Sequence, residues 1–554
     1  MKTYNLHKIA VMALVMLWSV SCTDFLAEDP KGQILDNSSF ADRNDLEGAI
    51  HALNRQVNMG TKGMINFIPM LQGDDLSAHP ASNKANGREF DNYDVSDMNN
   101  SMTTSMGNWI WLWKIVKASN YIINGVANTP DVTPDEITFA LGQAYYWRAW
   151  AYFYLVRVWG PIPKMLTGEI DLEIGVATVA EIYDLIIHDL KEAEKLPANY
   201  TESPWAMNGV NVVVSKGAAE ATLSYVYLCM AGWPLNKGTE YYQLAAAEAL
   251  KVIEASDNGT YYYRLYDEYW KIHSKAYNSN NTEVIMAVYY STAFGTGDYG
   301  QAGRGTINDL HDISGAYNDT RAEIGFYCDF PEGPRKEWTY PAVTYHKTKY
   351  QAYPWWSTEI PEEERQPYFR KSAFTSDNNS AGTYEYDHSQ SYESQCNGWT
   401  DQLHQVVRLA EVYCWYAEAI GRSGQTNAKA IEVLNKVRNR ANGADGPQNI
   451  YSAGMSPNDL AEAAYNEHGW EIAGWYWGSI AARYYDMQRM DRVKDHFNYR
   501  KQNPEREVAP GVFMKEPFGP TGEWDQSKMF VPYPATDVRM NPNLANVDKF
   551  KLIN

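Results

Sequence analysis

Flat aromatic side chains are the residues of this sequence best suited to contact a ligand, and several lie between residues 261 and 403, where Gly, Asn, Ser and Tyr are frequent. A pyranose ring has an apolar C–H face, so binding sites for sugars combine an aromatic ring with polar groups at the rim. The alternative for each ring is that it only packs a loop onto the body of the protein. The aromatic candidates for ligand contact are Tyr289, Tyr290, Trp355, Trp356 and Trp399.

Three charged residues are candidates for the polar part of such a site. Asp74 and Asp75 could accept hydrogen bonds from ligand hydroxyls, and the guanidinium of Arg370 could donate two at once. The two aspartates fit general acid/base catalysis poorly, because adjacent residues generally point apart and the two carboxyls of a glycosidase must face each other across a bond. A solvated turn is the simpler interpretation of Asp74 and Asp75.

The motifs of the sequence predict no catalytic site, no metal and no cofactor. Residues 295–300 fit the pattern GxGxxG, but they continue into the loop-like GQAGRGTINDL and not into the helix that a dinucleotide site needs. The 11 histidines form no HExxH motif, and neither a GxSxG elbow nor a Walker loop is present. Residues 362–364 are three glutamates, a charge run typical of a solvated surface. The sequence therefore offers no constellation of residues that predicts catalysis.

Helices must position these candidates, because most of the remaining chain has helical periodicity. Within residues 38–57, for example, Phe40, Leu46 and Ile50 recur at the spacing of one helix face. The helices form hairpin-length pairs, which indicates tetratricopeptide-like repeats, with a plain helical bundle as the alternative. Further helices are expected at residues 108–127, 135–159, 179–195, 212–230, 241–255, 406–424 and 427–442, and a short strand at residues 283–290.

The densest group of aromatic residues lies elsewhere, in residues 144–163. On a helix these rings would occupy more than one face, and a helix that is apolar nearly all round is buried. Pro161 and Pro163 prevent this helix from continuing. We therefore expect Trp147 and its neighbours to belong to the core of the scaffold and not to a ligand platform.

The N-terminus predicts a lipoprotein signal. Positively charged residues precede an apolar run at residues 9–20, which is too short to span a bilayer, and Ser19-Val20-Ser21 lead into Cys22. Lipoprotein signal peptidase needs this arrangement, and the acyl chains added to the freed cysteine anchor a protein stably. We expect lipidation of Cys22, with ordinary cleavage near Ser21 as the alternative.

Charge and cysteine content restrict the partners. The net charge of −20 over 554 residues argues against nucleic acid and anionic lipid headgroups, which the average surface would repel. Cys229 and Cys414 lie in helical apolar patterns and should be small buried residues. Cys328 and Cys396 lie in the loop-rich stretch, where an oxidising compartment would permit a bridge that the sequence alone cannot assign.

Several segments, in this order, together resemble the SusD/RagB-like outer-membrane nutrient-binding lipoproteins, and the resemblance spans nearly the whole chain. Besides the signal with Cys22, the segments that carry it are SSFADRNDLEGAIHAL, WLWKIVKASNYII, RAWAYFYLVRVWGPIP, VVRLAEVYCWYAEAI, AIEVLNKVRNRA, RYYDMQR and FVPYPATDVRMNPNLAN.

The resemblance implies a mainly α fold, with about four tetratricopeptide-like helix pairs as a scaffold and a loop-rich variable region with short strands. It implies no catalysis and supplies no fixed ligand residues. We expect a signal peptide at residues 1–21, a lipidated cysteine and tether at 22–37, and a single domain at 38–554. Within that domain we expect a helical scaffold at 38–260 and 404–500, a ligand-binding region at 261–403 and a C-terminal coil at 501–554.

Proteins of this family sit as a lid over a SusC-like TonB-dependent barrel, to which they deliver an oligosaccharide or sometimes a peptide. The resemblance therefore implies a lipid-anchored protein of the outer membrane that faces the cell exterior and binds a glycan. Peptide uptake by the same fold is the first alternative. A glycoside hydrolase is less favoured, because the sequence offers no facing carboxylate pair. A pure helical-repeat scaffold is also less favoured, because the loop-rich stretch carries many aromatic residues suited to a ligand.

Overall fold

The computed structural model describes most of the chain from residue 40 onward. The described residues are 40–61, 72–78, 91–92, 109–169, 171–206, 209–274, 277–290, 320–340, 343–345, 352–369, 403–474 and 479–554. The predicted signal, Cys22 and the tether lie outside them, as do Arg370, Cys396, Trp399 and the GxGxxG segment.

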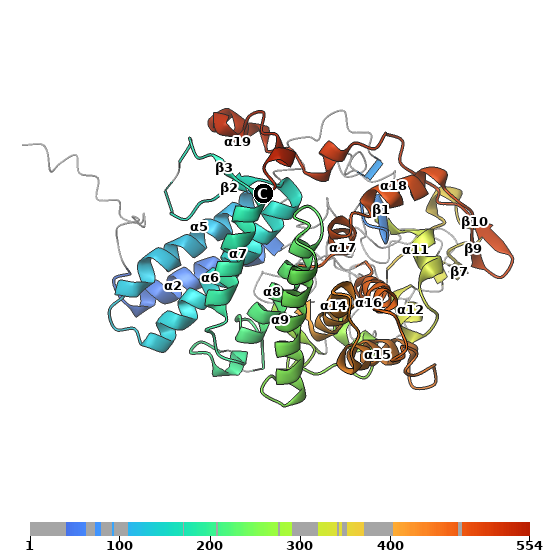
Figure 1. The fold of residues 1–554 in the computed structure, drawn as a ribbon, viewed down its shortest axis with the longest axis horizontal. Coiled ribbons are helices and arrows are strands. Elements are labelled where there is room, and N and C mark those ends of the chain that lie inside the picture. The colour runs from blue at the N-terminus through green and yellow to red at the C-terminus, as the bar shows by residue number, and fades with distance from the viewer. Residues whose placement is uncertain are drawn as a thin grey trace, which may run out of the picture.

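The first half of the protein is a row of antiparallel helices, and each helix packs on the next one in the chain. Figure 1 shows the first four together on one side of the molecule, with α8 and α9 beside them. All of them fall within a few residues of the predicted helices, because each carries a regular apolar face. These helices are α2 (Arg43–Thr61), α5 (Trp109–Gly125), α6 (Pro134–Trp159), α7 (Val179–Ala193), α8 (Lys216–Ala231) and α9 (Thr239–Asp257).

The row continues after the loop-rich stretch with α14 (Leu409–Arg422), which packs on α9, on α15 (Ala428–Asn442) and on α16 (Pro457–Ile472). The successive pairs are α2 with α5, α6 with α7, α8 with α9, and α14 with α15. The prediction of about four helix pairs is therefore confirmed. Cys229 and Cys414 are buried within this scaffold, also as predicted.

Helix α6 is the central element of the scaffold. A capping box between Thr133 and Glu136 starts it, and Gly160, at φ +74°, ends it. A Cβ on Gly160 would lie 3.0 Å from the ring of Phe530, so the close approach of the C-terminal segment also requires glycine. Trp147 is 1% exposed, which confirms that the aromatic residues of this helix form core.

Short two-stranded antiparallel sheets and two short helices organise the described parts of the loop-rich stretch. The sequence predicted helix from residue 406 onward, but residues 406–408 belong to a strand, because they pair with the strand predicted at residues 283–290. The pairs are β4 (Val284–Val288) with β8 (His404–Arg408), β1 (Leu76–Ala78) with β5 (Thr320–Ala322), and β6 (Val343–Tyr345) with β7 (Ala352–Pro354); the helices are α11 (Ile324–Asp329) and α12 (Pro334–Thr339).

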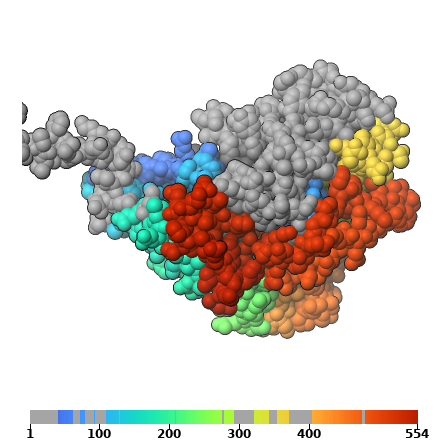
Figure 2. Space-filling model, turned by 90° about the horizontal axis from the view of Figure 1, so that it is seen from above, coloured from blue at the N-terminus to red at the C-terminus, as the bar shows by residue number. Residues whose placement is uncertain are grey.

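The last 70 residues run back along the molecule to its N-terminal half. Figure 2 shows them as a continuous band from the β9–β10 hairpin to the N-terminal helices. Near its end the chain donates and accepts main-chain hydrogen bonds, from Val531 N to Val158 O and from Val179 N to Leu552 O. The predicted coil at 501–554 therefore also carries regular elements. The C-terminal elements are α17 (Arg483–Arg489), α18 (Val493–Gln502), β9 (Arg506–Ala509), β10 (Val512–Met514) and α19 (Ala535–Met540), and the remaining small sheet is β2 (Ile162–Pro163) with β3 (Val176–Ala177).

Candidate functional site

Asp74 and Asp75 do not form the solvated turn that their sequence suggested. The carboxylate of Asp74 accepts hydrogen bonds from Nε and Nη2 of Arg483, at 2.7 and 2.9 Å. Asp75 is 3% exposed, and its Oδ2 accepts a hydrogen bond from the main-chain N–H of Gly474 at 2.8 Å. Both aspartates therefore fasten the start of β1 to the segment that follows α16 and to α17.

The environment of Asp75 favours its protonated form. Burial raises the pKa of this carboxyl to about 7, and the neighbouring charge of Asp74 acts in the same direction. The Gly474 N–H and the charge of Arg483 oppose this effect without overcoming it. Asp75 thus titrates near neutral pH, although its side chain is almost fully buried.

Tyr289 and Tyr290 attach the end of β4 to its surroundings. The hydroxyl of half-buried Tyr289 donates to the carbonyl of Asn278 at 2.8 Å. Tyr290 is buried, shares a hydrogen bond of 2.7 Å with the hydroxyl of Thr61, and packs its ring 4.4 Å from that of His404. These contacts give Tyr290 a structural role in joining β4 to α2.

The Trp355–Trp356 pair lies in a different hydrophobic cluster, with Ile324 and Val508. Trp355 is 0% exposed, and its ring is enclosed edge to face by Tyr327 and Trp356, each with ring centroids 5.2 Å away. A fully enclosed ring offers no face to a sugar, so Trp355 supports the loop from inside. Trp356 is only half-buried and remains the aromatic candidate of this pair.

The structure thus separates the predicted site residues into three places: the Asp74–Asp75 turn, the end of β4, and the Trp355–Trp356 cluster. The predicted charge run is also only partly solvated. Glu362 and Glu363 are exposed, but the carboxylate of Glu364 pairs with the buried guanidinium of Arg321 at 2.6 Å. Arg370 and Trp399 stay predictions, because they lie outside the described residues.

A buried network of ion pairs, which the sequence did not reveal, joins the loop-rich stretch to the scaffold. Glu471 of α16 accepts hydrogen bonds from Arg408 at 2.8 Å, from Arg440 at 2.6 Å and from Arg335 of α12 at 2.9 Å. Burial alone would raise the pKa of Glu471, but these three guanidinium groups hold it well below its usual range. Glu283, directly before β4, completes the network through Arg408 and Arg440.

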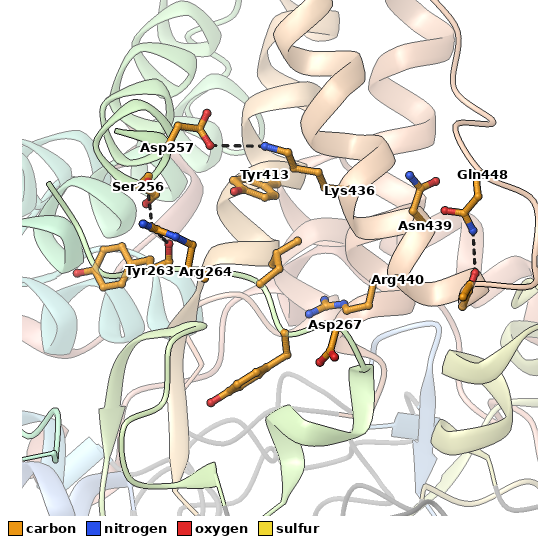
Figure 3. Close-up of a pocket in the computed structure, with 14 residues that line it drawn as sticks. Ser256, Asp257, Tyr263, Arg264, Asp267, Tyr413, Lys436, Asn439, Arg440 and Gln448 are labelled. Atoms are coloured by element: carbon orange, nitrogen blue, oxygen red, sulfur yellow. Dashed lines mark hydrogen bonds and ion pairs between the residues drawn. The ribbon is translucent and has the colours of Figure 1, made fainter. Parts of the chain in front are cut away.

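An open pocket of about 580 Å³ lies beside this network, between the end of α9, the first turns of α14, and α15. We call it the α9–α15 pocket. Figure 3 shows Asp257 and Arg264 on one side of it and Asn439 and Gln448 on the other. The sequence analysis missed this pocket, because three segments far apart in the chain build it. The only signal of it was that residues 261–267 belong to the predicted ligand-binding region.

The described residues also limit other kinds of site. Within them, no three His, Cys, Asp or Glu side chains come together in a group that could hold a metal ion. The helices of the same ranges include none with the length and apolarity to cross a membrane.

The thiol of Cys328 donates to the carbonyl of Glu507 at 3.4 Å.

Two models of known families match the chain. One, described as starch-binding and associating with the outer membrane, matches residues 35–228. The other, described as the SusD family, matches residues 328–548. Between them they cover the scaffold helices except α9 and the end of α8, the second part of the loop-rich stretch and nearly all of the C-terminal segment.

Two curated relatives align over almost their full length. A SusD-like protein of Bacteroides ovatus is 23% identical, and the match covers 98% of each chain. SusD-like protein P2 of Formosa agariphila is also 23% identical, over 90% of this chain and 93% of that one.

Solved structures share the fold at lower identity. A SusD superfamily protein of Parabacteroides distasonis is 21% identical, with a TM-score of 0.66 over 90% of this chain and 98% of that one. A second structure, described as a crystal structure with xylogluco-oligosaccharide, is 20% identical, with a TM-score of 0.65 over 91% and 98%. With both family models and the long relatives in agreement, this chain belongs to the SusD/RagB family.

Proposed function

We propose that this protein captures a glycan at the cell surface and delivers it to a SusC-like TonB-dependent transporter of the outer membrane. The observation that carries the proposal is the similarity in fold, over almost both full chains, to a protein whose structure contains a xylogluco-oligosaccharide. The local chemistry is consistent with binding and not catalysis, because Asp74 and Asp75 are both engaged by protein groups.

The proposed contacts lie on the loop-rich region. The half-buried ring of Trp356 would stack on a sugar, together with Trp399, while Arg370 would donate to hydroxyls. Asp75, Tyr290 and Trp355 are buried and would position these loops from below. Asp74 is held by Arg483, and Tyr289 is held through its hydroxyl. No catalytic group, metal or cofactor takes part in this proposal.

The proposed location follows from the N-terminus. Acyl chains on Cys22 would anchor the protein in the outer membrane, and the tether up to residue 37 would let the domain cover the mouth of a barrel on the outer surface. The family description already associates such proteins with the outer membrane. A lid of this kind raises the local concentration of captured glycan at the transporter.

A calorimetric titration with a panel of ligands tests the proposal. The panel contains xyloglucan oligosaccharides, maltoheptaose, oligogalacturonide and mixed peptides. We expect at least one oligosaccharide to bind, and Trp356→Ala and Trp399→Ala to weaken that binding by about tenfold each, or about 1.4 kcal/mol. Phe513→Ala, which removes a ring that is 60% exposed on β10, is the matched control and should leave affinity unchanged.

Each other outcome points to a different function. Binding of peptides alone would favour peptide uptake, and release of shorter products from a labelled glycan would establish a hydrolase. Isolation of the tagged protein from native outer membranes in mild detergent tests delivery: a TonB-dependent barrel should accompany it in comparable amount. If a barrel accompanies the protein but no ligand of the panel binds in the titrations, only the role of a helical-repeat scaffold remains.

A further inference from the structure

We infer that the α9–α15 pocket is an additional binding site, for a short neutral oligosaccharide. This inference rests on the proposed glycan-binding function and gives the ligand a place that the loop candidates Trp356, Arg370 and Trp399 do not include. It is carried by the size of the pocket, by the way its polar groups are held, and by the balance of its charges.

The size and walls of the pocket suit a small ligand. Its volume of about 580 Å³ falls within the range of roughly 300–1,000 Å³ that is usual for small-molecule sites. Rigid elements form two walls, namely the C-terminal end of α9 and the face of α15 that carries Asn439 and Arg440. The loop after α15, with Ala444 and Gln448, is exposed and forms the rim, so a ligand can enter from solvent.

Two side-chain amides at the rim are fixed in position before any ligand binds. Asn439 donates from Nδ2 to the side-chain oxygen of Asn449 at 3.1 Å and accepts the main-chain N–H of Asn449 at 2.7 Å. Gln448 donates from Nε2 to the carbonyls of Gly443 and Gly446, at 2.7 and 3.0 Å. Each amide oxygen has two lone pairs, so both side chains keep capacity to accept from a sugar hydroxyl. Groups held in this way lose little entropy on binding.

A tyrosine ring contributes to the apolar lining of the pocket. Tyr266 lines the pocket and is half-buried, and its hydroxyl accepts the main-chain N–H of Thr282 at 3.3 Å. Its ring is also braced edge to face by Tyr277, with centroids 5.4 Å apart. A ring fixed at its hydroxyl and its edge can present a face to the C–H surface of a pyranose.

The charges that line the pocket are balanced within the protein, which favours a neutral ligand. Asp257 pairs with Lys429 at 3.0 Å and Lys436 at 3.5 Å. Asp267 pairs with Lys271 at 2.5 Å.

The two guanidinium groups of the pocket are both engaged by protein groups, Arg264 by main-chain carbonyls and Arg440 by carboxylates. Arg264 donates to the carbonyls of Ser256 and Tyr263, at 2.7 and 2.6 Å, next to the negative end of the α9 dipole. Arg440 pairs with Glu283 and Glu471, and its buried Nε has no hydrogen-bond partner among the described residues. The groups on offer are therefore dipoles and a ring, which match hydroxyls better than an ionised ligand.

Hydrogen exchange at the pocket provides a test that reports on location. The full protein is measured with and without xyloglucan oligosaccharide or maltoheptaose at ten times the dissociation constant, with oligogalacturonide as the acidic comparison. We expect exchange of residues 439–449 to slow by about tenfold with a neutral ligand. Ala444→Trp fills the mouth of the pocket and should abolish this slowing, whereas Ala453→Trp, on the same exposed loop but outside the lining, should keep it.

The outcomes separate the pocket from the proposed function. Slowing that persists in Trp356→Ala and disappears in Ala444→Trp supports the inference. If the wild type binds an oligosaccharide but residues 439–449 exchange as before, or if Ala444→Trp retains the slowing, the pocket inference is overturned while glycan binding stands. If only oligogalacturonide slows exchange, the ligand of the pocket is acidic and the inference of a neutral ligand is overturned. If the wild type binds no member of the panel, both the pocket inference and the proposed glycan binding are overturned.

Discussion

At the scale of single residues, the buried charged groups of this protein hold together segments that are far apart in the chain. Asp75 and Glu516 are two buried carboxyls for which this use is costly, because burial raises the pKa of each to about 7. The charge of Glu323 adds to the effect at Glu516, while Arg500 and two hydrogen bonds reduce it. Near neutral pH these two groups are therefore poised between protonated and charged forms, and stability should depend on pH there.

Replacing Asp75 by Asn should reduce this dependence. Between pH 4 and pH 7 the folded state holds a proton on Asp75 that the unfolded state has lost, so the free energy of unfolding falls as the pH rises. Asp75→Asn removes this proton uptake, so the slope of the unfolding free energy against pH should become less steep by up to about 1.4 kcal/mol per pH unit. The fold should be kept, because the amide oxygen can still accept the Gly474 N–H. Urea titrations at several pH values measure the slope.

Asp445→Asn, on an exposed loop, is the control for this slope and should leave it as in the wild type. The part of the slope that remains in Asp75→Asn belongs to Glu516 and other groups. An unchanged slope in Asp75→Asn would show that Asp75 is charged in the folded protein.

At the scale of elements, the close packing of α14 on α16 depends on a residue without a side chain. A Cβ on Gly421 would lie 2.5 Å from the carbonyl oxygen of Pro457 and 2.6 Å from the main-chain N of Ala461. Both atoms belong to the main chain at the start of α16, so they cannot move without moving the helix. The spacing of these two helices is thus set by a backbone-to-backbone contact.

Gly421→Ala should therefore destabilise the protein by about 1–3 kcal/mol through overpacking. Gly48→Ala is the matched control: Gly48 lies on α2 with nothing within 4 Å of an added Cβ, and there alanine should stabilise by about 0.5–1 kcal/mol. Chemical denaturation of both variants measures the difference. Similar effects of the same sign would contradict the packing argument.

The elements that the sequence predicted well are those with local signals. Helix α6 has its start in Thr133 and Glu136 and its end in Gly160 and Pro161, and the predicted range of 135–159 is close to the observed Pro134–Trp159. Residues 406–408 had no such signal, since a short apolar run fits a strand or a helix equally, and only pairing with β4 decides. That partner is more than 100 residues away in the chain.

The candidate site was harder to predict for the same reason. Trp355 looks like an exposed loop residue in the sequence, but contacts with Tyr327 and with Val508 of β9 enclose it. Asp74 looks solvated until Arg483, about 400 residues later, is placed beside it. The burial of a loop side chain depends on segments from elsewhere in the fold, and periodicity within the loop carries no information about them.

At the scale of the whole molecule, the proposed membrane attachment requires Cys22, because the lipid is added to the sulfur of this residue. A Cys22→Ala variant expressed with its signal should lose its partitioning into the detergent phase of a Triton X-114 extraction, because no acyl chain can be attached. Its folded domain should bind ligand as the wild type does. Partitioning that stays unchanged would refute lipidation.

The end of the chain closes the beginning of the scaffold, and this has a consequence for the order of folding. The first N–H groups of α7, those of Val179 and Ala180, donate to the carbonyls of Leu552 and Ile553. Two N–H groups of the first turn of α7 therefore gain their protein acceptors only when residues 552 and 553 dock, whereas the side chain of Thr178 accepts the N–H of Glu181 locally. Contacts over such sequence separations are slow to form. Docking of residues 552 and 553 is therefore a late event in folding, and it completes the start of α7.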